Sequence, residues 1–125
     1  MIKLFIWVVI YTSILAFSQI ILKIGLVKVG SFNIKESKDL FSLGLALLSN
    51  PYVLLGTALM ASSYFLWLAI LSWFKLSVAF PMTALGFIFV ALFSYFMLGE
   101  KLLLHNYLGI ALIAVGIFLL LFKQI

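Results

Sequence analysis

Few side chains in this sequence could act as an acid, a base or a metal ligand. The chain has three acids (Glu36, Asp39 and Glu100), one histidine (His105) and no cysteine. Without cysteine, disulfides and thiolate metal sites are excluded. His105 has no carboxylate or serine partner in a catalytic arrangement, and the sequence has no glycine-rich phosphate loop. We therefore expect no enzyme activity, no cofactor and no metal site.

Other candidate residues are polar or aromatic side chains inside long apolar runs. In the first run, Gln19 either donates a hydrogen bond to a neighbouring helix or lines a substrate path. Lys23 either snorkels to the membrane surface or presents its ammonium to an anionic head group. Trp67 lies deep in the second run and either packs against other helices or forms the wall of a pocket.

Composition determines the class of protein that must position these residues. Of the 125 residues, 67% are hydrophobic and only 9% are charged, and the mean hydropathy is +1.38. A soluble domain of this size would need far more charge to cover its surface. The net charge of +5 comes with lysines and no arginine, which indicates lysines flanking a membrane rather than a nucleic-acid surface.

The apolar runs predict a single all-α membrane domain with four transmembrane helices. We expect the helices at about residues 4–29, 51–73, 78–98 and 106–122, because about twenty apolar residues span a hydrocarbon core of roughly 30 Å. Residues 38–49 have helical spacing but are too short to span, which favours a short interfacial helix between the first two spans.

Local signals refine two of the helix starts. Asn50 followed by Pro51 combines a capping side chain with proline at the first helical position. Ser77 is expected to cap the third span, which would leave Pro81 in the first turn, where no interior hydrogen bond is lost.

Four spans place both termini on one side of the membrane, but the lysines orient the chain poorly. Five lysines on one side face three on the other, so insertion in either direction remains open. The terminal side has Lys3, Lys75 and Lys123, and the opposite side has Lys23, Lys28, Lys35, Lys38 and Lys101.

The last span contains two glycines, Gly109 and Gly116, seven residues apart. Glycines at this interval form a shallow groove on one helix face, which suits a partner helix. The partner is either a helix of the same chain or a second subunit. A dimer contact is the favoured interpretation, because four short helices enclose little space for a solute.

Three segments carry a resemblance to a known family: NPYVLLG, FLWLAILSWFKLSVAFPMTAL and FMLGEKLLLHNYLGIALIAVGIFLLL. They resemble the drug/metabolite transporter superfamily, in its EamA-like and small-multidrug-resistance-like branches. Within it, they are most similar to four-helix subunits that flip undecaprenyl-phosphate-linked aminoarabinose. The resemblance implies a bacterial inner-membrane flippase, with Glu100 as the acid in the turn between the third and fourth spans. It also implies a homodimer, or a heterodimer with a paralogous subunit, with Gly109 and Gly116 at the contact.

The sequence departs from the small multidrug exporters at two positions. Those proteins carry a glutamate in the middle of their first helix, where this chain has Leu15, and a tryptophan in the third, where it has Thr83. A proton-coupled exporter without an intramembrane acid has nothing to titrate. Drug export is therefore the alternative to the flippase, and a non-transporting assembly subunit is a third hypothesis.

A polyprenyl-phosphate sugar would need three kinds of contact. Hydroxyl and amide side chains would bind the polar head, a lysine (Lys23 or Lys101) would pair with the phosphate, and aromatic rings would stack on the sugar. The predicted substrate-binding residues are Ser18, Gln19, Lys23, Tyr64, Trp67, Glu100 and Lys101.

Overall fold

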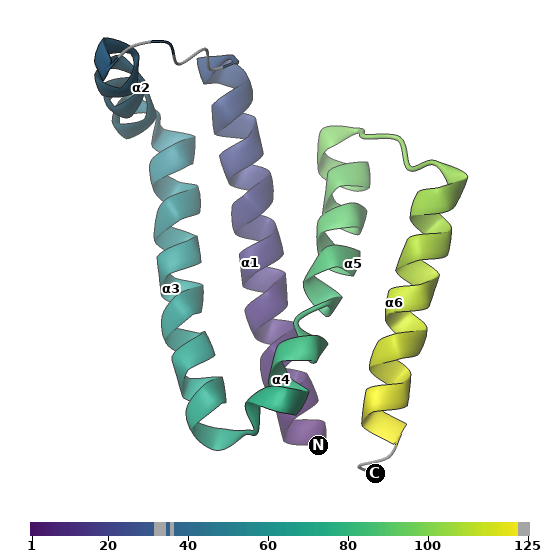
Figure 1. Cartoon of the computed structure of the whole chain (residues 1–125). Coiled ribbons are helices and arrows are strands. Elements are labelled where there is room, and N and C mark those ends of the chain that lie inside the picture. Colours follow the sequence, from purple (N-terminus) through teal and green to yellow (C-terminus); the bar gives the residue numbers. More distant parts are fainter. Residues whose placement is uncertain (32–34, 36, 123–125) are drawn as a thin grey trace.

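The chain folds into long helices that run side by side and are joined by short turns (Figure 1). The structure is a computed structural model and describes residues 1–31, 35 and 37–122. Its elements are α1 (Ile2–Val29), α2 (Ser37–Ser49), α3 (Pro51–Trp73), α4 (Leu76–Met82), α5 (Leu85–Phe93), η1 (Ser94–Leu98) and α6 (Leu104–Phe122). Across these described residues there is no β-strand.

Four helical segments are long and apolar enough to cross a membrane: α1, α3, the combined segment Leu76–Leu98, and α6. The all-α fold with four transmembrane helices is therefore confirmed. A short helix, α2, does form between the first two spans, but its position at the membrane surface remains a prediction. The start of α1 and the end of α6 lie at the same end of the molecule (Figure 1).

Helix α1 is central, with α3 packed along one side and α5 along another (Figure 1). Glycines allow α1 and α3 to approach closely. A Cβ added at Gly56 would lie 2.7 Å from Cγ of Leu22, and one added at Gly25 would lie 2.9 Å from Cγ2 of Val53. Since real Cβ atoms essentially never come this close, both positions require glycine for packing.

The start of α3 agrees with the sequence. Asn50 is extended, and its side-chain oxygen accepts hydrogen bonds from the backbone N–H of Tyr52 (2.9 Å) and Val53 (3.3 Å), with Pro51 at the first helical position. The Asn50 amide nitrogen also donates to the carbonyl oxygen of Gly25, at 3.0 Å. The cap therefore ties the start of α3 to the far end of α1.

The expected start of the third span is wrong. Lys75 is the residue that precedes α4, and its carbonyl oxygen accepts from the N–H groups of Val78 (3.1 Å) and Ala79 (3.0 Å). Ser77 is therefore inside the helix, and Pro81 lies beyond the first turn, where its missing N–H removes a helical hydrogen bond. The helix stops at Met82 and resumes at Leu85, with shorter-range hydrogen bonds between.

The apolar core lies toward the terminal end of the molecule. Its buried members are Leu4, Val8, Ile70, Val78, Ala79 and Met82, from α1, α3 and α4. Helix α6 is packed more loosely than this core, because Ile117 is its single buried residue. The molecule is therefore held together mainly around α1, and most of the surface of α6 is uncovered.

Candidate functional site

The polar residues predicted on α1 point in different directions. Ser18 is fully buried, and its hydroxyl donates to the carbonyl oxygen of Leu15 at 2.6 Å. Gln19 and Lys23 are exposed and lie four residues apart, so they share one face of the helix. The structure therefore brings Gln19 and Lys23 together on the outer surface and leaves Ser18 in the packed interior.

The hollow next to Lys23 is shallow and is formed almost entirely by α1 itself. It has a volume of about 390 Å³ and is lined by Lys23, Leu26, Val27, Gly30 and Ser31. Among the described residues, no other helix contributes to its lining, so the Lys23 ammonium lies on an outward surface rather than in a cleft between helices.

The two aromatic candidates of α3 differ in their surroundings. Trp67 stacks on Tyr11 of α1, with ring centroids 5.2 Å apart and planes 26° from parallel, and it lies 6.2 Å from the ring of Phe80. Tyr64 is 58% exposed and contacts the edge of Phe65. The structure thus gives Trp67 a packing role and presents Tyr64 outward.

Glu100 is positioned by the end of the third span. That span finishes in a π-helical turn, η1, followed by Gly99 in the left-handed conformation (φ 69°). The N–H groups of Gly99 and Glu100 both donate to the carbonyl oxygen of Ser94. Left-handed backbone favours glycine, so the Gly-Glu pair fixes the direction in which the chain leaves the membrane span.

A groove of about 490 Å³ runs between the end of the third span and the start of α6. Its polar lining consists of Ser94, Glu100, His105 and Asn106, and its floor includes Gly109. The structure therefore groups Glu100 with Gly109. Lys101 is exposed beside the groove and is not among its lining residues. Within the described ranges, no cluster of His, Asp or Glu could hold a metal ion.

Neither glycine of α6 is packed tightly against another part of the described chain, although Gly109 is half-buried beside the groove. A Cβ added at Gly109 or Gly116 would meet no atom within 4 Å. Gly116 and the intervening Leu112 are exposed, Leu112 by 73%. The face around Leu112 and Gly116 is therefore uncovered in the single chain, and the use of the two glycines as a dimer contact remains a prediction.

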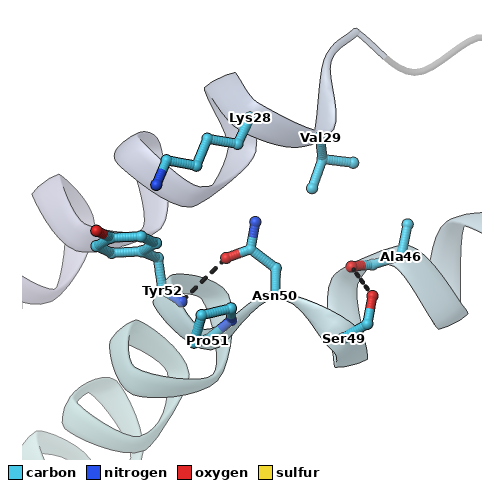
Figure 2. Close-up of a pocket in the computed structure, with 7 residues that line it drawn as sticks. All are labelled: Lys28, Val29, Ala46, Ser49, Asn50, Pro51 and Tyr52. Carbon is cyan, nitrogen blue, oxygen red and sulfur yellow. Dashed lines mark hydrogen bonds between the residues drawn. The ribbon is translucent and has the colours of Figure 1, made fainter.

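A pocket missed by the sequence analysis lies where α1, α2 and α3 meet (Figure 2). It has a volume of about 380 Å³, and Lys28, Asn50 and Tyr52 line it, with Ser49 and apolar residues. The Lys28 ammonium lies 4.0 Å from the centroid of the Tyr52 ring. These two residues are 24 positions apart, so no local sequence pattern could pair them.

Four apolar spans with a few polar residues on outward surfaces and at turns define a multi-pass integral membrane protein. Its curated relatives are small membrane subunits. The chain is 35% identical over 69 residues to the "probable 4-amino-4-deoxy-L-arabinose-phosphoundecaprenol flippase subunit ArnE" of Pectobacterium atrosepticum, which covers 55% of this chain and 61% of the relative. A protein of the same name from Enterobacter sp. is 44% identical over 68 residues, which are 54% of this chain and 59% of the relative. Another from Hamiltonella defensa is 38% identical over 66 residues, which are 53% of this chain and 60% of the relative.

These relatives confirm the resemblance seen in the sequence. The match spans about three fifths of the length of each relative. No family model matches the chain, and no solved structure does.

Proposed function

We propose that this protein is one subunit of a flippase that moves a polyprenyl-phosphate-linked sugar of the aminoarabinose type across the bacterial inner membrane. The observation that carries the proposal is its 35–44% identity to proteins named as flippase subunits for that lipid. The chain is then a transporter component rather than an enzyme.

The outer face of α1 supports a polar path for the sugar. Gln19 is within about 6 Å of the helix midpoint at 1.5 Å per residue, and its side chain is exposed. An amide facing hydrocarbon loses its hydrogen bonds to water, which is costly. A substrate head group or a second subunit that covers Gln19 would restore these bonds. Lys23, on the same face, would pair with the phosphate as it passes.

The open face of α6 supports a two-subunit assembly. A path for a sugar head needs walls on several sides, and the described chain leaves α6 largely uncovered. The second subunit is a copy of this chain or a paralogue of similar size, and Gly109 and Gly116 form the contact. Three further residues are proposed to bind the sugar within this assembly because they are exposed: Glu100, Lys101 and Tyr64. Ser18 and Trp67 would instead stabilise the packing of α1 against its neighbours.

Neither alternative gains support from a specific feature. All three acids of the sequence lie outside the four apolar helices, so a proton-coupled cation exporter would have no carboxylate inside its membrane spans. A non-transporting assembly subunit would need Gln19 only as a contact with its partner and would have no use for Lys23 on the same face.

The first prediction tests translocation directly. Liposomes would hold the purified protein, with its paralogous subunit where one copurifies, and undecaprenyl-phosphate aminoarabinose. A membrane-impermeant amine reagent reports the sugar exposed outside. We expect a labelled fraction above that of protein-free liposomes, and a rate lowered about fivefold by Lys23→Gln, the loss of roughly 1 kcal/mol of charge pairing.

Controls separate the hypotheses. Lys23→Arg keeps the charge and should retain the rate. Gln19→Ala should slow transport, because it removes an amide from the proposed polar path, whereas an assembly subunit would tolerate this change. Labelling equal to that of empty liposomes would reject the flippase. Proton release on adding a quaternary ammonium drug would favour the exporter instead.

A further inference from the structure

The pocket between α1, α2 and α3 combines a positive charge with a fixed framework. Lys28 supplies the charge, and the ring of Tyr52 holds its ammonium through a cation–π contact of 4.0 Å to the ring centroid. Among the described residues no carboxylate forms an ion pair with Lys28, and none lines the pocket. The ammonium therefore keeps donors for an anionic ligand.

The floor of this pocket is rigid because Asn50 uses both ends of its amide. Its nitrogen donates to Gly25 of α1 and its oxygen accepts from the first N–H groups of α3. Gly25 lies directly against Val53 and Tyr52. Ser49 likewise donates its hydroxyl to the carbonyl oxygen of Ala46, at 3.0 Å (Figure 2). Among the described lining residues, the Lys28 ammonium and the Tyr52 hydroxyl are thus the polar side-chain groups that no hydrogen bond of the fold uses.

The depth of the pocket matches that of lipid phosphates. At 1.5 Å per residue, Lys28 lies about 19 Å from the midpoint of α1, just beyond the roughly 15 Å half-thickness of the hydrocarbon core. At the other end of the molecule, Trp7 and Trp73 pair with ring centroids 5.3 Å apart, as expected of an interfacial aromatic belt. A centred helix therefore places the Lys28 ammonium among head groups.

We propose that this pocket binds the phosphate group of a membrane lipid, with Lys28 as the cationic ligand and Tyr52 as its positioning residue. The volume of about 380 Å³ is within the range of small-molecule pockets, roughly 300–1,000 Å³. Val29 and Pro51 give it apolar walls that suit the start of a lipid tail. The identity of the lipid as a polyprenyl phosphate rests on the proposed function.

Binding measured without transport tests the site. The purified chain in detergent, with any subunit that copurifies, would be titrated with undecaprenyl phosphate, with undecaprenol and with inorganic phosphate, and bound ligand counted by native mass spectrometry. We expect undecaprenyl phosphate to bind more tightly than undecaprenol, and Lys28→Gln to weaken it about tenfold, the loss of a hydrogen bond from a charged group. Lys3→Gln is the matched control, since it removes the same charge at the other end of α1.

Variants of Tyr52 test whether its ring positions the Lys28 ammonium or the charge alone is sufficient for binding. Tyr52→Phe keeps the ring and should retain binding, while Tyr52→Leu should weaken it. Equal loss in Lys28→Gln and Lys3→Gln, or equal binding of undecaprenol, would overturn the site. Inorganic phosphate binding as tightly as the lipid would overturn the lipid assignment. A protein that binds the lipid through Lys28 but does not translocate it would keep this inference and reject only the flippase.

Discussion

Lys23 and Lys28 lie five residues apart on α1, but they meet the membrane differently. Lys23 is about 11 Å from the midpoint of the helix and faces outward in a shallow hollow. Lys28 is about one and a half turns further out and lies over an aromatic ring in a three-helix pocket. A lysine inside the hydrocarbon is costly unless it is paired or snorkels. The different depths and surroundings are consistent with the two proposed roles: contact with the substrate during translocation for Lys23, and binding of a lipid head group for Lys28.

The aromatic pair of α3 provides a prediction at the same scale. Trp67→Leu removes the ring that stacks on Tyr11 and should cost about 1–3 kcal/mol of stability, because a half-buried aromatic side chain loses part of its packing. Tyr64→Leu should change stability by less than about 0.5 kcal/mol, since the ring is mostly exposed. Thermal unfolding in detergent measures both.

Transport by the same variants separates the two roles. Tyr64→Leu should slow sugar-lipid translocation without loss of stability. If Trp67→Leu were as stable as the wild type, the stacked geometry would not be a packing contact.

At the scale of elements, the crossing of α1 and α3 depends on glycine. Gly56→Ala should destabilise the protein by about 1–3 kcal/mol, since the new methyl group would overlap Leu22. Gly44 is also helical, in α2, but a Cβ there would meet nothing within 4 Å. Gly44→Ala should therefore be neutral or stabilising by up to about 1 kcal/mol, through helix propensity alone.

Denaturant unfolding in detergent compares the two alanine variants. Changes of opposite sign in the free energy of unfolding would support the close crossing. Equal small changes would show that α1 and α3 adapt to the added methyl group.

The four spans could be predicted because hydropathy and length depend on local sequence. The cap at Asn50 was likewise readable, since its partners are the next residues of its own helix. The start of α4 could not be predicted in this way. The preference of serine for helix caps favours Ser77, but the first helical hydrogen bonds are accepted by the carbonyl oxygen of Lys75. The Lys28–Tyr52 contact depends on how two distant helices cross, and Ser18 and Gln19 separate because adjacent helical residues point about 100° apart. These features require the packed structure.

At the scale of the whole molecule, three spans pack as a unit and the fourth is attached along a narrow strip. Of the α6 residues, Ile117 alone is buried, and the half-buried ones are Asn106, Gly109, Ile110, Ile113, Leu120 and Leu121. Gly109 lies at the edge of that strip, in the groove beside the third span, and Gly116 is exposed; a Cβ added at either glycine would meet no atom within 4 Å. In a membrane, small residues on a helix face let a partner helix approach closely. We therefore expect α6 to complete its packing on a second subunit.

Leucine at the two glycines tests this assembly. Gly109→Leu and Gly116→Leu should each lower the crosslinked dimer fraction in detergent about fivefold or more, because a branched side chain would hold the two helices apart. Ala111→Leu is the matched control, since Ala111 is exposed but lies about 200° around the helix from Gly109 at 100° per residue, and its dimer fraction should stay near the wild-type value. A Cβ at either glycine would meet no atom within 4 Å and Ala111 is exposed, so we expect the thermal unfolding of all three variants to remain close to wild type. Unchanged crosslinking in both glycine variants would place the subunit contact on another face, and the outer surface of α1 would then be the next to test.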